Sequence, residues 1–296
     1  MDSLEHVQGK FTFEGADKII AFAQQHDMKV VGHNLCWHQQ SPAWMFADAD
    51  KKPLPREQAL ANLKNHIDTV VKHFKGNVIG WDVVNEAMSD SPKEYLRDTP
   101  AHRAIGDDFI EKAFEFAHAA DPDVALYYND YNIEEPVKRE KVIRLIRQLK
   151  AKNLRIDGVG IQGHWLINHT DPKTVDDAIT AFTNEGMKVM ITEMDIDVLP
   201  RKSGAEISAT EKLGANPYKD GCPPEVLQQQ ADRYAAFFAV FMKHRDVVTR
   251  ITFWGVDDGT SWLNGWPVKG RTNYPLLFDR ELKPKPAFFA VLKSIS

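Results

Sequence analysis

Two glutamates stand at the ends of apolar runs, where a carboxylate is costly to bury. Glu86 follows Asn85 at the end of the run "WDVVNE", and Glu193 lies within "MITEMDID". A buried carboxylate without a partner loses solvation energy or takes up a proton, so we expect each glutamate to be near water, paired or reactive. Two opposed carboxylates can hydrolyse a glycosidic bond, because one serves as acid and then base while the other acts as nucleophile or activates water. Either glutamate taken singly is as consistent with a salt bridge, so the hypothesis depends on the pair.

Aromatic side chains near the ends of similar runs indicate a pocket for sugars. Flat apolar rings stack on sugar rings, while neighbouring amides and imidazoles hydrogen-bond to hydroxyl groups. The candidates for this role are Trp37, Tyr131, Trp254, Trp262 and Trp266. Trp81 stands at the start of its run, and we expect it to pack in the core instead.

Histidines near these runs leave a metal site as a second interpretation. The candidates are His33, His38, His164 and His169. They form neither an HExxH motif nor a helical pair four residues apart, so a metal hydrolase is the weaker hypothesis. The two cysteines, Cys36 and Cys222, form no disulfide framework and no metal-binding motif. We therefore expect neither a metal nor another cofactor.

The strands that must position these residues are predicted by six short, nearly continuous apolar runs. They are residues 28–37, 78–86, 124–130, 156–165, 187–196 and 251–258. Continuous hydrophobicity is typical of strands buried on both faces. Amphipathic stretches that indicate helices lie between and around them, at residues 15–26, 56–74, 104–120, 135–152, 173–185, 224–245 and 285–294. This alternation predicts an α/β fold with a parallel sheet.

The carboxyl end of each apolar run changes to polar or aromatic residues. In parallel α/β folds, and above all in barrels, these ends form the face on which the active site is built. No internal repeat, low-complexity segment or linker marks a second domain, so we expect residues 1–296 to form one catalytic domain. A polar insertion at residues 200–220 follows the strand of Glu193 and is expected to be a loop.

Composition argues against several classes of partner. The 37 basic and 42 acidic side chains are interspersed and give a net charge of -5, without the basic patch that nucleic acid requires. No apolar segment approaches the roughly 20 residues of a membrane span. The first residues, "MDSLEHVQGK", lack the pattern of a signal peptide. We expect neither nucleic acid nor a membrane as partner.

Eight motifs in order, over about residues 8–294, resemble those of the family 10 glycoside hydrolases, which are mainly endo-1,4-β-xylanases. They are "GKFTFEGADKIIAFA", "VGHNLCWHQQSPAW", "WDVVNEA", "LYYNDYNIE", "IDGVGIQGHW", "ITEMDID", "TFWGVDDGTSW" and "PLLFD". The resemblance implies a (β/α)8 TIM-barrel fold. It also implies hydrolysis with retention of configuration, by a double displacement.

The resemblance also assigns roles to matching positions. Glu86 would be the acid/base, Glu193 the nucleophile, and Asn85 the group that holds the 2-hydroxyl of the sugar. His164 would orient Glu193, with Asp195 behind it as a supporting carboxylate. The other sugar-binding positions would be His33, Trp37, Gln40, Gln162, Trp254 and Trp262.

One departure from the family concerns the start of the fold. The family barrel has two strands and a helix before the segment that the first residues match, and its second strand carries a Glu, an Asn and a Lys that bind sugar. A barrel truncated to about six strands has two open edges that invite association. Three interpretations follow: a fragment of a protein whose barrel an inserted domain interrupts, a homo-oligomer that pairs its open edges, or an open sheet with weak activity. We favour the first for origin and the second for behaviour.

The sequence therefore predicts a retaining endo-1,4-β-xylanase that acts on xylan or xylo-oligosaccharides. A cellulase or mixed β-glycanase is one alternative. An inactive or weakly active carbohydrate-binding barrel fragment is another. A polysaccharide substrate favours a secreted or cell-surface location in the native context.

Overall fold

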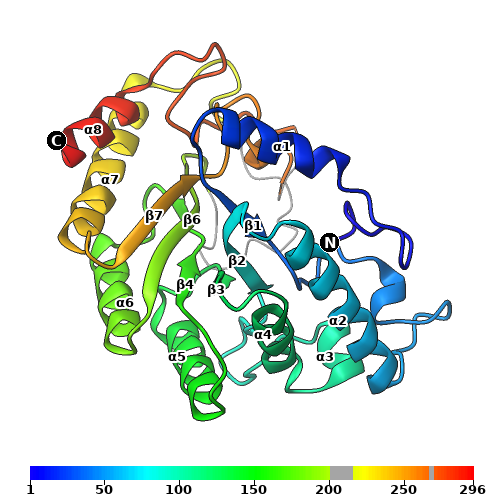
Figure 1. The fold of residues 1–296 in the computed structure, drawn as a ribbon. Helices are drawn as coiled ribbons and strands as arrows, with labels where there is room; N and C mark the ends of the chain where they lie inside the picture. The colour runs from blue at the N-terminus through cyan, green and yellow to red at the C-terminus, as the bar shows by residue number, and fades with distance from the viewer. Residues whose placement is uncertain (201–215, 267–269) are drawn as a thin grey trace. The chain divides into compact units, whose positions relative to one another are not determined.

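The computed structural model describes residues 1–200, 216–266 and 270–296. Helices and strands alternate along the chain, as Figure 1 shows. The chain divides into two compact units, one formed by Met1–Asp130 with Glu140–Gly160 and the other by Tyr131–Arg139 with Ile161–Ser296. Each unit is described by itself.

The strands of the first unit follow one another in the order β1, β2, β3, β4, and the last residue of β4 belongs to the second unit (Figure 1). Their bounds are β1 Val30–His33, β2 Val78–Asn85, β3 Ala125–Asp130 and β4 Gly158–Ile161. Strand β2 pairs in parallel with β1 and with β3, and Asn85 at its end is in register with Asn129. All of β2 except Ile79 is buried, which explains its continuous run of apolar residues.

The helices of the first unit are α1 Glu14–Gln25, α2 Arg56–His73, α3 Pro100–Ile105 and α4 Phe109–Ala120, and α5 Pro136–Ala151 has residues in both units. Among them, α2 and α4 pack against each other, α4 also packs on the strands, and α1 buries only Ala23. Leu63, Ile67 and Val70 form the buried stripe of α2. The guanidinium of Arg56 makes paired 2.7 Å hydrogen bonds to the carboxylate of Asp108, which join the start of α2 to the start of α4.

The second unit is centred on β6 Lys188–Asp197, which pairs in parallel with β5 His164–Leu166 and with β7 Val248–Phe253. Its helices are α6 Pro172–Asn184, α7 Pro224–Lys243 and α8 Pro286–Ile295. Trp165 and Phe237 are buried and stack with 4.0 Å between ring centroids. Aromatic packing of this kind holds α7 against the strands.

The predicted alternation of six strands with helices is confirmed, and several boundaries are corrected. The run at residues 156–165 forms two strands, because Gly163 takes a φ of +81° and breaks the extended backbone between β4 and β5. The predicted helix at residues 104–120 covers the end of α3 and all of α4, because Gly106 with a φ of +104° ends α3 at Ile105 and α4 begins at Phe109. Strand β1 is four residues long and shorter than predicted, and β7 begins before the predicted range 251–258 and ends within it, at Phe253.

Two other expectations can be placed. Trp81 is buried in the core, as predicted. The predicted loop at residues 200–220 lies largely outside the described residues, which include only Pro200 and residues 216–220 of it.

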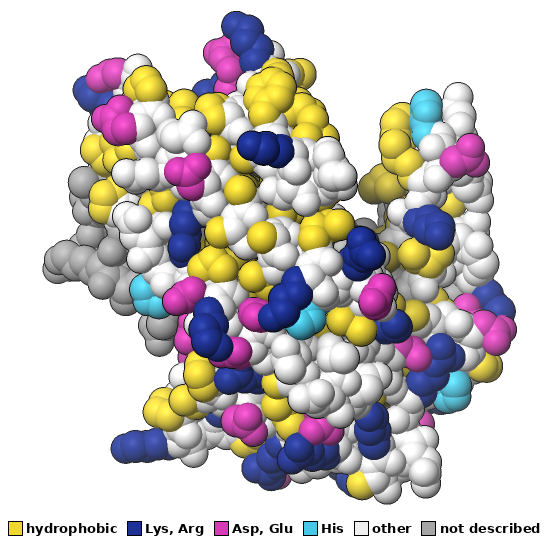
Figure 2. Space-filling model, turned by 90° about the vertical axis from the view of Figure 1, so that its left-hand side faces the viewer, with side chains coloured by type: hydrophobic (Ala, Val, Ile, Leu, Met, Phe, Trp, Pro, Cys, Tyr) yellow, Lys and Arg dark blue, Asp and Glu magenta, His cyan; other side chains and the backbone are white. Residues whose placement is uncertain are grey.

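Among the described residues, no helix combines the length and the apolarity needed to cross a membrane. On the face that Figure 2 shows, hydrophobic side chains lie among charged side chains of both signs.

Candidate active site

Glu86 follows the end of β2 with an unusual backbone. Its φ is +56°, a left-handed conformation that few residues other than glycine adopt and that costs free energy. Two neighbours hold this conformation: the N–H of Glu86 donates to the carbonyl of Asn129 at 2.9 Å, and Nε of Arg97 donates to the carbonyl of Glu86 at 3.0 Å. The backbone therefore turns out of the strand at this residue.

The carboxyl group of Glu86 is almost buried and lies near the ring nitrogens of two aromatic side chains. Nε1 of Trp37 donates to Oε2 of Glu86 at 2.9 Å. Nε2 of His38 lies 4.0 Å from the same oxygen. The residue is 8% exposed, so solvent screens these contacts only weakly. The hydrogen bond from Trp37 fixes the orientation of this carboxyl group.

Backbone pairing beyond β1 explains how Trp37 reaches this position. The chain after β1 continues beside β2, where the N–H of Asn85 donates to the carbonyl of Cys36 at 2.9 Å and Trp37 forms a parallel bridge with Asn85. The side-chain amide of Asn85 lies 2.9 Å from Nδ2 of Asn129. Three of the predicted site residues, Trp37, Asn85 and Glu86, thus meet at the ends of β1, β2 and β3.

Tyr128 supports the segment that follows Glu86, and its role was not predicted. Its hydroxyl accepts from the N–H groups of Ala87 at 2.9 Å and Met88 at 3.0 Å, and it donates to Oδ2 of Asp130 at 2.6 Å. Burial and the charge of Asp130 raise the pKa of Tyr128 well above its usual range, so it stays a donor. The polar residues in "LYYND" were the signal available in the sequence.

The predicted sugar-binding residues His33 and Gln40 lie in different surroundings. Nδ1 of His33 lies 2.9 Å from Oδ2 of Asp82, a buried carboxylate on β2. Asp82 was not predicted, although an acid inside an apolar run marks it. Gln40 is exposed, with a φ of +49°, and its carbonyl accepts from the N–H of Asp2. These contacts place His33 beside the strand of Glu86 and Gln40 against the first residues of the chain.

In the second unit, His164 lies between two carboxylates of β6. Nε2 of His164 is 3.1 Å from Oε2 of Glu193, and its Nδ1 is 3.1 Å from Oδ1 of Asp195. The parallel pairing of β5 with β6 sets this geometry, because His164 is in register with Asp195. Burial alone would lower the pKa of His164, but the charges and hydrogen bonds of Asp195 and Glu193 outweigh it and raise the pKa to about 10. The ring is then an imidazolium that donates to both carboxylates.

Two tryptophans and a glutamine complete this group. Nε1 of Trp262, in the short 3-10 helix Trp262–Asn264, donates to Oδ2 of Asp195 at 2.8 Å. The rings of Trp262 and Trp254 lie with centroids 4.9 Å and 6.4 Å from that of His164. Gln162 is buried, and its carbonyl accepts from the N–H of Glu193 at 2.8 Å. The predicted residues of this unit therefore form one connected cluster.

The remaining aromatic candidates lie in other settings. Tyr131 directly follows β3 and is buried, with Nζ of Lys138 lying 3.7 Å from its ring centroid. Trp266 is 41% exposed and follows the same 3-10 helix as Trp262. Its N–H donates to the carbonyl of Trp262 at 3.0 Å. Tyr131 is therefore packed beneath a lysine, whereas Trp266 offers part of its ring to solvent.

The histidines considered as metal ligands contact carboxylates or backbone. His33 binds Asp82, His38 lies near Glu86, and His164 binds Glu193 and Asp195. The N–H of His169 donates to the carbonyl of Leu166. Within residues 1–200, 216–266 and 270–296, no group of three or more His, Cys, Asp or Glu side chains is arranged to hold a metal ion.

Each unit thus presents one glutamate among hydrogen-bonding groups: Glu86 directly after β2 and beside Trp37, and Glu193 within β6 and beside His164. Parallel strands alternating with helices, with functional groups toward the strand ends, are the features of (β/α)8 enzymes and of other parallel α/β enzymes. Comparison with known families gives the more particular assignment. The family model of glycosyl hydrolase family 10 matches residues 1–294, and the chain belongs to this family of glycoside hydrolases.

Similar proteins agree with this assignment. Endo-1,4-beta-xylanase A of Xylanibacter ruminicola is 46% identical over 288 residues, which are 96% of this chain and 78% of that protein. A beta-1,4-xylanase of Dictyoglomus thermophilum is 45% identical over 284 residues, covering 96% and 76%. The solved structure of a family 10 endoxylanase from a sugarcane soil metagenome is 40% identical, with a TM-score of 0.91 and coverage of 99% and 84%. A mutant structure in complex with xylotriose is 38% identical, with a TM-score of 0.88 and coverage of 99% and 86%.

Proposed function

We propose that this chain is an endo-1,4-β-xylanase that hydrolyses xylan with retention of configuration, through a double displacement that uses Glu86 and Glu193. The names of the similar proteins support the substrate class. The xylotriose complex of a similar protein supports an oligosaccharide ligand. The observation that carries the mechanism is the position of His164 between Glu193 and Asp195.

Glu193 is the nucleophile in this proposal. An imidazolium that donates to its Oε2 stabilises the ionised carboxylate, which is the form that attacks the anomeric carbon. Asp195 supplies the second negative charge that keeps His164 protonated, and Trp262 holds Asp195 through Nε1. The attack forms a covalent glycosyl-enzyme and breaks the glycosidic bond.

Glu86 is the acid and then the base. Its carboxyl group gives a proton to the leaving oxygen as the bond breaks, and it then takes a proton from the water that hydrolyses the glycosyl-enzyme. Trp37 fixes the side chain through its 2.9 Å hydrogen bond to Oε2. The left-handed backbone at Glu86, held by Asn129 and Arg97, fixes where the side chain leaves the strand.

The test follows both turnover and stereochemistry. The chain is incubated with xylo-oligosaccharides, and proton NMR identifies the anomer of the first product, which we expect to be β. Glu193→Gln should abolish turnover, whereas Glu225→Gln, an exposed glutamate in the first turn of α7, should keep it. An α product, or a Glu193→Gln variant with undiminished activity, would refute the mechanism.

A further inference from the structure

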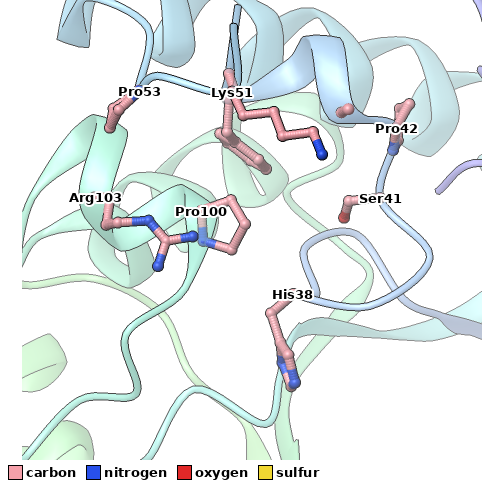
Figure 3. A pocket seen from close by; sticks show the side chains of 10 residues that line it. His38, Ser41, Pro42, Lys51, Pro53, Pro100 and Arg103 are labelled. Carbon is pink, nitrogen blue, oxygen red and sulfur yellow. The ribbon is translucent and has the colours of Figure 1, made fainter.

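A cavity of about 270 Å³ lies in the first unit, next to the group around Glu86 (Figure 3). Ten residues line it, and none of them is Asp or Glu. Two of them, Lys51 and Arg103, are cationic. The volume lies just below the ~300–1,000 Å³ of pockets that hold drug-sized ligands, so it suits a single sugar ring and not a length of polysaccharide.

One wall of the cavity is a short loop with its own hydrogen bonds. Ala47 and Pro53 form an antiparallel bridge, and the N–H of Leu54 donates to the carbonyl of Phe46 at 3.0 Å. Oδ1 of Asp48 accepts from the N–H of Lys52 at 2.9 Å. Lys51 lies at the tip of this loop with a φ of +63°. The loop is therefore closed on itself, and it carries the ammonium group of Lys51 toward the cavity, as Figure 3 shows.

The opposite wall comes from α3. Thr99 caps this helix by accepting from the N–H of His102, and Pro100 and Arg103 line the cavity from its first turn. The guanidinium of Arg103 pairs with Asp98 at 2.9 Å, but the two side chains are 46% and 75% exposed. An exposed ion pair of this kind contributes little and exchanges readily. Arg103 can therefore turn to an anionic ligand in the cavity.

Apolar side chains also line the cavity. Pro53 is exposed and Pro100 is half-buried, whereas Pro42 and Phe46 lie buried in the wall behind them. Flat faces of this kind pack against the carbon atoms of a sugar ring. A ligand that matches the whole cavity has a ring with an apolar face and a carboxylate at its edge.

His38 joins this cavity to the proposed acid. His38 is one of the residues that line the cavity, and its ring points away from the other lining side chains (Figure 3) to bring Nε2 within 4.0 Å of Oε2 of Glu86. A ligand in the cavity would therefore lie one imidazole ring away from the carboxylate that protonates the glycosidic oxygen. A substituent attached to the polysaccharide near the cleaved bond could reach it.

We propose that this cavity binds an acidic side sugar of the polysaccharide, a uronic acid whose carboxylate pairs with Lys51 and Arg103. The proposal rests on the function proposed above and deepens it, because it makes the enzyme prefer xylan that carries uronic acid substituents. Charge-assisted hydrogen bonds from Lys and Arg to a carboxylate are short and strong, and they distinguish it from a neutral group of the same size.

The experiment compares two xylo-oligosaccharides that differ only in the side sugar, one with glucuronic acid and one with its neutral counterpart, in which the carboxyl group is reduced to an alcohol. The readout is the ratio of kcat/KM for the acidic substrate to kcat/KM for the neutral one. We expect a ratio above one that falls as salt rises. Lys51→Met with Arg103→Met should lower it about tenfold or more, the effect of one charge-assisted hydrogen bond.

Lys52→Met provides the matched control, because Lys52 is an exposed neighbour of Lys51 that does not line the cavity. It should leave the ratio unchanged. An equal ratio in the wild type and the double variant, or an equal fall in the control, would overturn the proposal. If the proposed function itself is wrong, neither the acidic nor the neutral oligosaccharide is hydrolysed. Calorimetric binding of the same two oligosaccharides would then give the ratio as dissociation constants and judge the cavity by itself.

Discussion

Nε2 of His164 lies 3.1 Å from Oε2 of Glu193. The same ring holds a second carboxylate through Nδ1, and both contacts are buried. Two carboxylates around one imidazole overcome the cost of burial and keep the ring charged, with a pKa of about 10. The cation in turn favours the ionised form of Glu193, which connects the packing of β5 on β6 to the chemistry of the proposed nucleophile.

Replacing His164 should impair catalysis without removing the nucleophile. His164→Gln leaves a neutral amide beside Glu193, so the ionised carboxylate loses a charged donor. We expect kcat on xylo-oligosaccharides to fall about 10- to 100-fold, the range of one hydrogen bond to a charged group. Trp262→Phe, which removes only the donor to Asp195, should cost less. A His164→Gln variant with unchanged kcat would contradict the role.

The charge of His164 can be observed directly. A histidine whose pKa is raised on folding stabilises the fold fully below its unfolded pKa of about 6.5. That contribution is lost as the pH rises through about 10. Nitrogen NMR of the imidazole should therefore show both ring nitrogens protonated from pH 6 to pH 8. If His164 instead loses its proton near pH 6.5, Glu193 and Asp195 do not raise the pKa of its imidazole.

The loss of activity on replacing Glu86 should be greater for substrates whose leaving group needs a proton. Without an acid, xylan must lose an unprotonated alkoxide, whereas an activated aryl glycoside has a leaving group that needs no proton. Glu86→Ala should therefore lower kcat/KM on xylan about 10²- to 10⁴-fold, the usual contribution of a general acid. On the aryl glycoside the first step should be largely spared. Equal losses of kcat/KM on both substrates would rule out Glu86 as the acid.

The sequence predicts those site residues whose position depends on the end of a strand. Asn85 and Glu86 follow an apolar run, and the change to polar residues marks the carboxyl end of β2 without any tertiary information. Glu193 also follows an apolar run, but β6 continues beyond it to Asp197. The alternation of strands and helices was predictable for the same reason, because a strand buried on both faces is apolar throughout.

Residues that depend on pairing between strands could not be predicted in the same way. Asp82 and Tyr128 contact the site through the register of β2 with its neighbours, and a local pattern does not contain that register. Arg97 reaches the carbonyl of Glu86 from a turn eleven residues later. The split between β4 and β5 depends on the backbone of Gly163, which a run of apolar residues conceals.

Glu134 should make stability depend on pH. It is buried, with its Oε1 accepting from Nε1 of Trp165 at 2.7 Å. Burial raises the pKa of Glu134 from 4.5 to about 7, although the hydrogen bond from Trp165 and the charge of Lys138 oppose this effect. A carboxyl group whose pKa is higher in the folded protein than in the unfolded chain stabilises the folded state when the group is protonated. Its contribution is therefore lost as pH rises from about 4.5 to above 7, by about 3 kcal/mol.

Glu134→Gln keeps the acceptor for Trp165 and removes the titration. Urea unfolding between pH 4.5 and pH 8 should show the free energy of unfolding of the variant falling less with pH than that of the wild type. A matched change at the exposed Glu225 of α7, Glu225→Gln, controls for the loss of one negative charge. If the two variants have the same pH dependence, Glu134 does not titrate as the structure indicates.

Gly32 should be intolerant of even one added methyl group. A Cβ built on Gly32 would lie 2.0 Å from Cε3 of Trp81, which is buried in the core beside it. β1 is paired with β2 at this point, with Gly32 opposite Trp81, so neither backbone can retreat. Gly32→Ala should therefore lower the free energy of unfolding by about 1–3 kcal/mol or more, the cost of overpacking a core.

Gly15→Ala is the matched control, because a Cβ added to Gly15 on α1 would meet no atom within 4 Å. Because Gly15 lies in the first turn of α1, its replacement should leave the free energy of unfolding unchanged or slightly higher, and urea unfolding of both variants measures the contrast.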